Sequence, residues 1–336
     1  MYPIPKAEPI PSIVELNKDV ESFVIQASAS RSRFFKDAYK PLQFVHLSDA
    51  HAVPELWSRM AEYINEYEDF ISFALHTGDY CGGSQEAYAD FYRDCTPCRR
   101  PIFNCVGNHD TLKVRGDKDG SCPKKDVRAL LFNHTEGWDV SFMPGEGSMT
   151  YYKDFPESNL RLIVLDCYYD REQQAVWLTE RLAEAREKGI HVITAAHEIS
   201  HPIVKKANVT FQTLTDFESV GGNRAHRFFD EIIADFKRAG GIHVVHLAGH
   251  EHSDMFGHTE RSVLNIAVEC ATNWDGWCDG KRVRGTKTYD CFNTVSVDTN
   301  LHLLKIVRIG DNADHYLRIK RTLCYDYKNQ RVIFNG

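Results

Sequence analysis

Five short polar segments contain side chains that could bind metal ions. They are Ser48-Asp49-Ala50-His51, Gly78-Asp79, Gly107-Asn108-His109-Asp110, His197 and Gly249-His250-Glu251-His252. Carboxylate, amide and imidazole groups are side chains with which proteins ligate divalent cations. A carboxylate such as that of Asp79 can also bridge two cations through its two oxygens, which an imidazole cannot do. The residue types therefore predict a metal centre.

Each polar segment follows an apolar run that we expect to form a buried strand. The runs span 42–47, 70–75, 102–106, 191–196 and 242–247. Stretches with helical spacing lie between them, for example 55–67 and the stretch with Ala175, Leu178 and Leu182. In open α/β sheets, ligands bind beyond the carboxyl ends of the strands. We therefore expect these distant segments to converge on one pocket.

The order of the predicted elements indicates an α/β fold with two packed mixed β-sheets between layers of helices, an α/β/β/α arrangement. Strands 263–268, 291–297 and 301–307 follow one another without helices, and the last two should form a hairpin around Asp298-Thr299-Asn300. We expect 111–155 and 198–223 to be irregular. The chain divides into a lead-in segment, 1–40, a core with the metal motifs, 41–260, and a strand-rich extension, 261–336, packed on that core.

In their order, the motifs D-x-H, G-D, G-N-H-D, H and G-H-x-H resemble those of the calcineurin-like metallophosphoesterases. The resemblance covers residues 41–260, and only the ordered combination is specific, because each motif alone is common turn chemistry. It implies that one ion is held by Asp49, His51 and His252, the other by Asn108, His197 and His250, and that Asp79 bridges both. It also implies that His109 is the catalytic histidine and Asp110 its orienting partner.

These roles imply a dinuclear-metal-dependent phosphoester hydrolase, either a phosphodiesterase or a phosphomonoesterase. Two adjacent cations can generate a hydroxide for in-line attack and stabilise both the attacking and the departing oxygens. A protonated His109 could protonate the leaving oxygen or stabilise developing charge. Manganese, iron or zinc would suit the ligands. Gly82 stands three residues after Asp79, where the purple acid phosphatases have their tyrosine, so the sequence departs from that iron(III) pattern.

Two functional alternatives use the same fold. A nuclease would need a basic groove beside the metals. A non-catalytic interaction scaffold would not need the complete ligand set or His109, and both are present.

Some site residues also have alternatives. His201 competes with His197, which we favour because it directly ends the run 191–196. Trp274, Trp277 and Arg282 lie in one basic loop and, together with Asn108, could bind the substrate by stacking and ion pairing. The alternative for that loop is a surface segment whose tryptophans pack on the core. The pair Cys95 and Cys98 lacks the second pair that a zinc knuckle would need.

The composition narrows the class of protein. The net charge of −7 and pI near 6.1 argue against a general nucleic-acid binder, although an acidic protein can still carry a basic groove. Of the phosphoester substrates that the resemblance implies, we therefore expect a small molecule. No apolar run is long enough to span a membrane, and Met1 to Ser12 has no apolar core of a secretory signal. Ten cysteines in 336 residues are too few for a disulfide framework. We therefore expect reduced thiols and a cytoplasmic protein.

Overall fold

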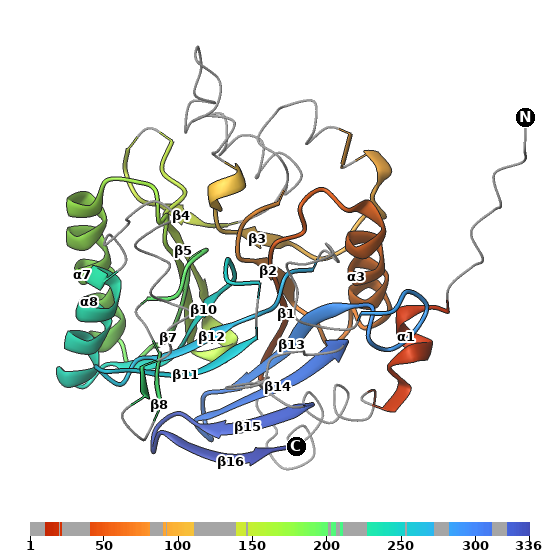
Figure 1. Ribbon diagram of the computed structural model, residues 1–336. Coiled ribbons are helices and arrows are strands. Elements are labelled where there is room, and N and C mark those ends of the chain that lie inside the picture. The colour runs from red at the N-terminus through yellow and green to blue at the C-terminus, as the bar shows by residue number, and fades with distance from the viewer. Residues whose placement is uncertain are drawn as a thin grey trace, which may run out of the picture.

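Two mixed β-sheets stack face to face at the centre of the protein (Figure 1). The computed structural model describes residues 11–19, 21, 41–80, 90, 91, 93–110, 139–145, 147–200, 203–205, 209, 210, 227–252, 254–271, 282–310 and 321–336. Apolar side chains from both sheets, among them Phe44, Phe73, Val164 and Ile266, form the core between them. The expected pair of packed mixed sheets is confirmed.

The first sheet has seven strands in the order β16-β15-β14-β13-β1-β2-β3. Strands β1, β2 and β3 are parallel, whereas β13 to β16 continue the sheet antiparallel from β1. The bounds are β1 Leu42–Leu47, β2 Phe73–His76, β3 Ile102–Asn104, β13 Cys291–Asp298, β14 Leu303–Gly310, β15 Thr322–Asp326 and β16 Arg331–Asn335. The hairpin expected around residues 298–300 is confirmed, with Asp298 paired to Leu303.

The second sheet has nine strands in the order β4-β5-β6-β7-β10-β12-β11-β8-β9. Its centre, β6 to β12, is parallel, and the strands at both edges are antiparallel. The bounds are β4 Ser141–Phe142, β5 Tyr151–Phe155, β6 Leu160–Val164, β7 His191–Ala195, β8 Ile203–Lys205, β9 Val209–Thr210, β10 Ile242–Ala248, β11 Met255–Thr259 and β12 Leu264–Ala267. A 3-10 turn, η1 (Pro156–Ser158), joins β5 to β6.

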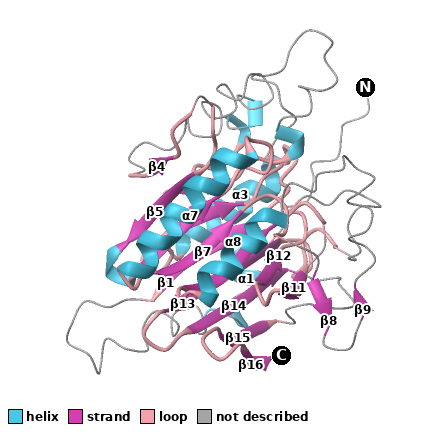
Figure 2. Cartoon of the chain, turned by 90° about the vertical axis from the view of Figure 1, so that its left-hand side faces the viewer, coloured by secondary structure: helices cyan, strands magenta, loops and turns pink. Residues whose placement is uncertain are grey.

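Helices cover the outer faces of the two sheets. Helices α7 (Arg171–Glu187) and α8 (Arg227–Arg238) lie side by side over the second sheet (Figure 2). Helices α3 (Pro54–Glu66) and α1 (Ile13–Leu16) pack on the first sheet. Asp170 caps α7 by accepting a hydrogen bond from the backbone amide of Gln173, as its capping-box spacing predicts. None of the helices in the described part is both long and apolar enough to cross a membrane.

The C-terminal strands are members of the two central sheets. Strand β13 pairs with β1 inside the first sheet, and β12 lies between β10 and β11 in the second. Residues 111–155 and 198–223 were expected to be irregular, and this was wrong for the described strands β4, β5, β8 and β9 that lie within them. Strand β5 is half-buried and near a sheet edge, so its sequence alternates too weakly to reveal it.

Candidate metal centre

The site lies at the carboxyl ends of the parallel strands, where the two sheets meet. Its side chains lie on the segments that directly follow five strands. In the first sheet, Asp49 and His51 follow β1, Asp79 follows β2 and Asn108 follows β3. In the second sheet, His197 follows β7, and His250 and His252 follow β10. Residues of both sheets therefore converge on one site, as the sequence predicted.

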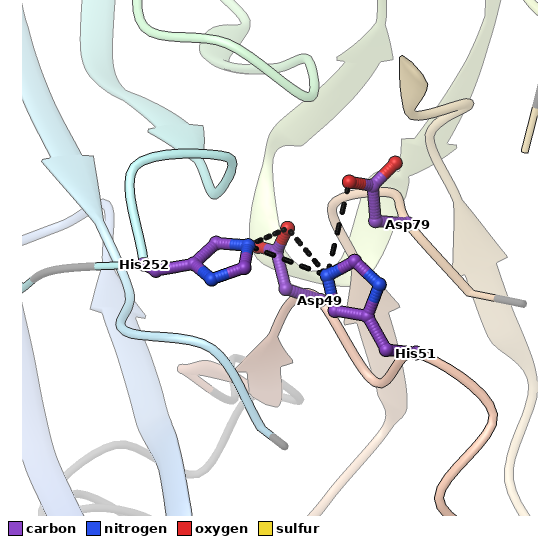
Figure 3. A group of neighbouring side chains, drawn as sticks. All are labelled: Asp49, His51, Asp79 and His252. Carbon is purple, nitrogen blue, oxygen red and sulfur yellow. Dashed lines mark hydrogen bonds and ion pairs between the residues drawn. The ribbon is translucent and has the colours of Figure 1, made fainter. Parts of the chain in front are cut away.

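A first group of ligand-type side chains consists of Asp49, His51, Asp79 and His252 (Figure 3). Its potential ligand atoms all lie within 4.8 Å of one another. His252 Nε2 lies 3.3 Å from Asp49 Oδ1 and 3.3 Å from His51 Nε2. His51 Nε2 lies 3.9 Å from Asp79 Oδ2. All four side chains are buried, so the group is enclosed by protein.

A second group consists of Asp79, His197 and His250, so Asp79 belongs to both groups. His197 Nε2 lies 3.4 Å from Asp79 Oδ2, 3.1 Å from His250 Nδ1 and 3.0 Å from the Asn108 side-chain oxygen. The Asn108 oxygen thus completes a second set of four donors. The same atom, Asp79 Oδ2, faces His51 of the first group and His197 of the second, so this carboxylate is placed to bridge two cations.

The donor set fits divalent metal ions. The His197 Nδ1–H donates to the Thr77 carbonyl oxygen at 2.7 Å, which leaves the lone pair of Nε2 directed into the cluster. The buried Asp49 Oδ1 accepts no hydrogen bond from the described residues. Buried lone pairs that face one another are costly unless a proton or a cation lies between them. A bound ion would satisfy both atoms.

The charges of the cluster support the same interpretation. Although burial opposes ionisation, the neighbouring His252 and His197 lower the pKa of the Asp49 carboxyl well below its usual range. Burial also opposes protonation of His197, but the carboxylate of Asp79 outweighs it and raises the pKa of His197. In the absence of metal, a proton on His197 therefore offsets part of the acidic charge. Metal ions compete with such a proton for the same atoms.

Many of the candidate ligands occupy strained backbone conformations. Asp49, His51, Asp79, His250 and His252 all have positive φ, between 44° and 67°. This left-handed region costs a non-glycine residue roughly 1–2 kcal/mol, and less for aspartate. Backbone hydrogen bonds hold the strained turns together: Asp49 N donates to Gly78 O at 2.9 Å and His51 N to Asp79 O at 3.1 Å. Outliers concentrated in this way are typical of functional sites.

His109 lies at the open side of the cluster. Its side chain is 34% exposed, and its Nε2 lies 3.9 Å from Asp79 Oδ2. The His109 ring packs edge-on against the ring of His51, with 4.9 Å between their centroids. Its backbone amide donates to Asp79 Oδ1 at 2.7 Å. The imidazole is therefore held beside the shared carboxylate and remains accessible.

Asp110 is fully buried and accepts three backbone hydrogen bonds. Its Oδ2 accepts from Asp79 N at 3.0 Å and Gly107 N at 2.8 Å, and its Oδ1 accepts from Tyr80 N at 2.9 Å. These contacts shape the turn that presents Asp79. The orientation of His109 by Asp110 stays a prediction.

The predicted substrate loop is described only in part. Trp274 and Trp277 lie outside the described residues, as does His201, the alternative to His197. Arg282 is described and only 7% exposed. Its guanidinium donates to the carbonyl oxygens of Cys270 at 2.7 Å, Ala271 at 3.0 Å and Tyr289 at 2.6 Å. These contacts favour a structural role for Arg282.

Two acidic residues beside the cluster were missed by the sequence interpretation. Glu198 follows His197 and accepts a hydrogen bond from the Tyr168 hydroxyl at 2.9 Å. Glu251 lies between His250 and His252, where burial, together with Glu198 and Asp49, raises its pKa to about 8. Their positions next to ligands were the only sequence signal. With this pKa, the Glu251 carboxyl is largely protonated at neutral pH and adds little negative charge to the centre.

The chain resembles known proteins in its sequence and in its fold. A family model described as calcineurin-like phosphoesterase matches residues 42–254. A curated protein named sphingomyelinase phosphodiesterase C, from Dictyostelium discoideum, is 25% identical over 231 residues, which is 60% of this chain and 47% of that protein. The chain thus spans about half the length of this relative. A crystal structure of a dimetal phosphatase from Danio rerio matches with a TM-score of 0.58 and 13% identity, covering 85% of this chain and 99% of that one.

Proposed function

The chain belongs to the calcineurin-like phosphoesterase family, and we propose that it hydrolyses phosphoesters with the help of two divalent metal ions. The family is one of phosphoester hydrolases, so the proposal concerns the number of ions, their ligands and the substrate. The observation that carries it is the pair of donor groups that share Asp79.

We assign one ion to Asp49, His51, Asp79 and His252, and the other to Asp79, Asn108, His197 and His250. The first set offers two carboxylates and two imidazoles, and the second offers one carboxylate, one amide oxygen and two imidazoles. Such mixed nitrogen and oxygen sets suit manganese, iron(II) or zinc. The dimetal phosphatase from Danio rerio, which shares the fold, is consistent with two ions.

Bound divalent ions would supply Lewis acidity, which polarises phosphoryl oxygens and makes water more acidic. The residues of the chain supply the positioning and the proton transfers. Asp79 and Asp49 offset the positive charge of the ions, and both remain ionised at neutral pH because the pKa of each carboxyl is lowered. The partly exposed His109 can reach a bound ester and donate a proton to the leaving oxygen.

A phosphodiester is the first substrate class to test. The support is the similarity to the sphingomyelinase phosphodiesterase from Dictyostelium discoideum. Bis-p-nitrophenyl phosphate represents the diesters and p-nitrophenyl phosphate the monoesters, each with added Mn²⁺. Single-stranded DNA in the same panel tests the nuclease alternative. Absence of hydrolysis of all three by Mn²⁺-loaded protein would contradict the proposal.

The metal assignment has its own test. Wild-type protein titrated with Mn²⁺ should bind close to two ions per chain. Asp79→Ala should weaken both binding events, because both donor sets lose the same carboxylate. Asp139→Ala removes a carboxylate that is exposed and belongs to neither donor group, and should leave Mn²⁺ binding unchanged. A single ion unaffected by Asp79→Ala would contradict the bridging assignment.

A further inference from the structure

A buried chain of hydrogen bonds leads from the middle of β10 to the segment that carries His197. His246 is fully buried, and its Nε2 lies 3.1 Å from the backbone carbonyl oxygen of Glu198, one residue after His197. The Thr194 hydroxyl lies 2.9 Å from His246 Nδ1 and 3.0 Å from His243 Nε2. None of these three side chains belongs to the donor groups of the metal centre.

A bulge in β10 makes this chain possible. In a regular strand, residues three apart point to opposite faces of the sheet. The pairing of β10 with β7 shifts register between His243 and Val245. This extra residue brings His243 and His246 to the same face, where a single Thr194 hydroxyl contacts both rings. Bulges are typical near active sites, where they redirect side chains.

The hydrogen bonds fix the direction of the protons. A carbonyl oxygen only accepts, so His246 Nε2 carries the hydrogen and donates to Glu198 O. In the neutral imidazole, Nδ1 then accepts from the Thr194 hydroxyl. The Thr194 oxygen in turn accepts from His243 Nε2–H, and burial, which lowers the pKa of His243 well below its usual value, keeps that ring neutral. Each of the three donors, His243, Thr194 and His246, thus has an acceptor in this series of hydrogen bonds.

The segment from His197 to Ser200 is also tied to neighbouring parts of the centre. The carbonyl oxygen of His197 accepts from Gly249 N at 2.9 Å, directly before the ligand His250. Two residues after Glu198, Ser200 N donates to the Asn265 side chain at 2.8 Å. A displacement of Glu198 would therefore move both His197 and the turn that presents His250.

We propose that His246 is a positioning residue that holds His197 and His250 in place for the second metal ion. This inference rests on the proposed function, because it presupposes that these two residues ligate an ion. It predicts that the hydrogen bond from His246 to Glu198 O, rather than the bulk of the ring, maintains the site. Partners that orient ligands in this way typically contribute about 10- to 100-fold to metal affinity.

The test compares His246→Leu with His246→Gln. The glutamine amide can place a donor where His246 Nε2 stands, whereas leucine fills the space without a donor. Mn²⁺ titration calorimetry should show the affinity of one of the two binding events reduced about tenfold in His246→Leu and restored to within roughly threefold of wild type in His246→Gln. The matched control is His191→Leu, which removes another buried imidazole of the same sheet, bonded to the Tyr327 hydroxyl at 2.7 Å, and should bind Mn²⁺ as wild type does.

A second measurement uses the metal-free protein. The Gly249 amide should exchange its hydrogen faster in His246→Leu than in wild type, and no faster in His191→Leu. If His246→Leu does not fold, Thr194→Val replaces it, because it removes the hydroxyl that donates to His246; a loss of Mn²⁺ affinity of about threefold is expected. Wild-type protein that binds no Mn²⁺ would refute the proposed function. Wild-type protein that binds two ions, together with unchanged binding by these variants, would refute the role of His246 alone.

Discussion

Replacement of Gly78 by alanine should disturb the centre without removing any candidate ligand. A Cβ atom at Gly78 would lie 2.4 Å from His197 Nδ1 and 2.9 Å from the Cα of Gly107. Gly78 also has φ of +104°, a conformation that alanine rarely adopts. The methyl group would displace the His197 ring from Thr77 O, its hydrogen-bond acceptor.

The cost of this substitution has three parts. The backbone strain costs roughly 1–2 kcal/mol, the overpacking a further 1–3 kcal/mol, and the lost hydrogen bond about 1 kcal/mol. Gly189→Ala is the matched control, because Gly189 also has positive φ, +66°, but a methyl group at this position would meet no atom within 4 Å. The control should therefore lose only the part that comes from backbone strain.

Urea unfolding of the metal-free variants measures the difference. The free energy of unfolding should fall by roughly 2–4 kcal/mol more in Gly78→Ala than in Gly189→Ala. Mn²⁺ titration of Gly78→Ala should also show a weakened ion at the His197 side. Equal destabilisation of the two variants, with full Mn²⁺ binding by Gly78→Ala, would refute the argument from close approach.

Four further predictions concern other residues. Ala52 is exposed with φ of 59°, so Ala52→Gly should raise the free energy of unfolding by roughly 1 kcal/mol. Ala183→Gly within α7 should lower it by about as much. Urea unfolding compares the two variants, and a lower free energy of unfolding in Ala52→Gly would contradict the strain argument. Burial lowers the pKa of His191 to about 4, below the unfolded value near 6.5, so the stability that neutral His191 contributes is present above pH 6.5 and is lost as the pH falls towards 4. His191→Gln should therefore reduce the loss of unfolding free energy between pH 7 and pH 4.5 by roughly 2 kcal/mol, and parallel pH profiles of the variant and the wild type would contradict this. Asp110→Asn should cost roughly 1–3 kcal/mol in urea unfolding, because an amide NH₂ would face a backbone donor, and should weaken Mn²⁺ binding; retention of both properties would show that the three hydrogen bonds are dispensable. Arg282→Ala should lower the free energy of unfolding and reduce the turnover of diester and monoester alike. A rise in KM for only one of the two substrates would instead indicate that Arg282 binds the substrate.

The strands that position the site could be predicted because they are short and almost wholly buried. The run 42–47 coincides with β1, and 242–247 falls one residue short of β10. The prediction for β2 began too early, at residue 70, because the amides of Phe70 and Ile71 both donate to Tyr67 O and close a turn there. Apolar periodicity does not reveal such local hydrogen bonds, so it could not predict where β2 begins.

The convergence of the candidate ligands could also be predicted, since residue type and strand ends determine it. The hydrogen-bond partners of individual side chains could not be predicted from the sequence. The orientation of His109 by Asp110 stays a prediction, whereas no sequence signal indicated that the Asp110 oxygens accept hydrogen bonds from the backbone amides of Asp79 and Tyr80. Likewise, the basic character of Arg282 predicted substrate binding, which stays a prediction, but it did not predict the hydrogen bonds to the carbonyl oxygens of Cys270 and Ala271. The direction of a side chain depends on tertiary neighbours that a linear motif does not specify.

The left-handed conformations of the ligands have a consequence for protein engineering. Glycine at His51, His250 or His252 would relieve strain of roughly 1–2 kcal/mol at each position, while the whole domain is held by only about 5–15 kcal/mol. A library screened for heat resistance in a chelating buffer would therefore enrich sequences that have lost the centre. The same library screened with Mn²⁺ present would retain it, because ligand binding adds to the stability of the folded state. The buffer used for selection would thus determine whether the selected sequences retain the metal-ligating histidines.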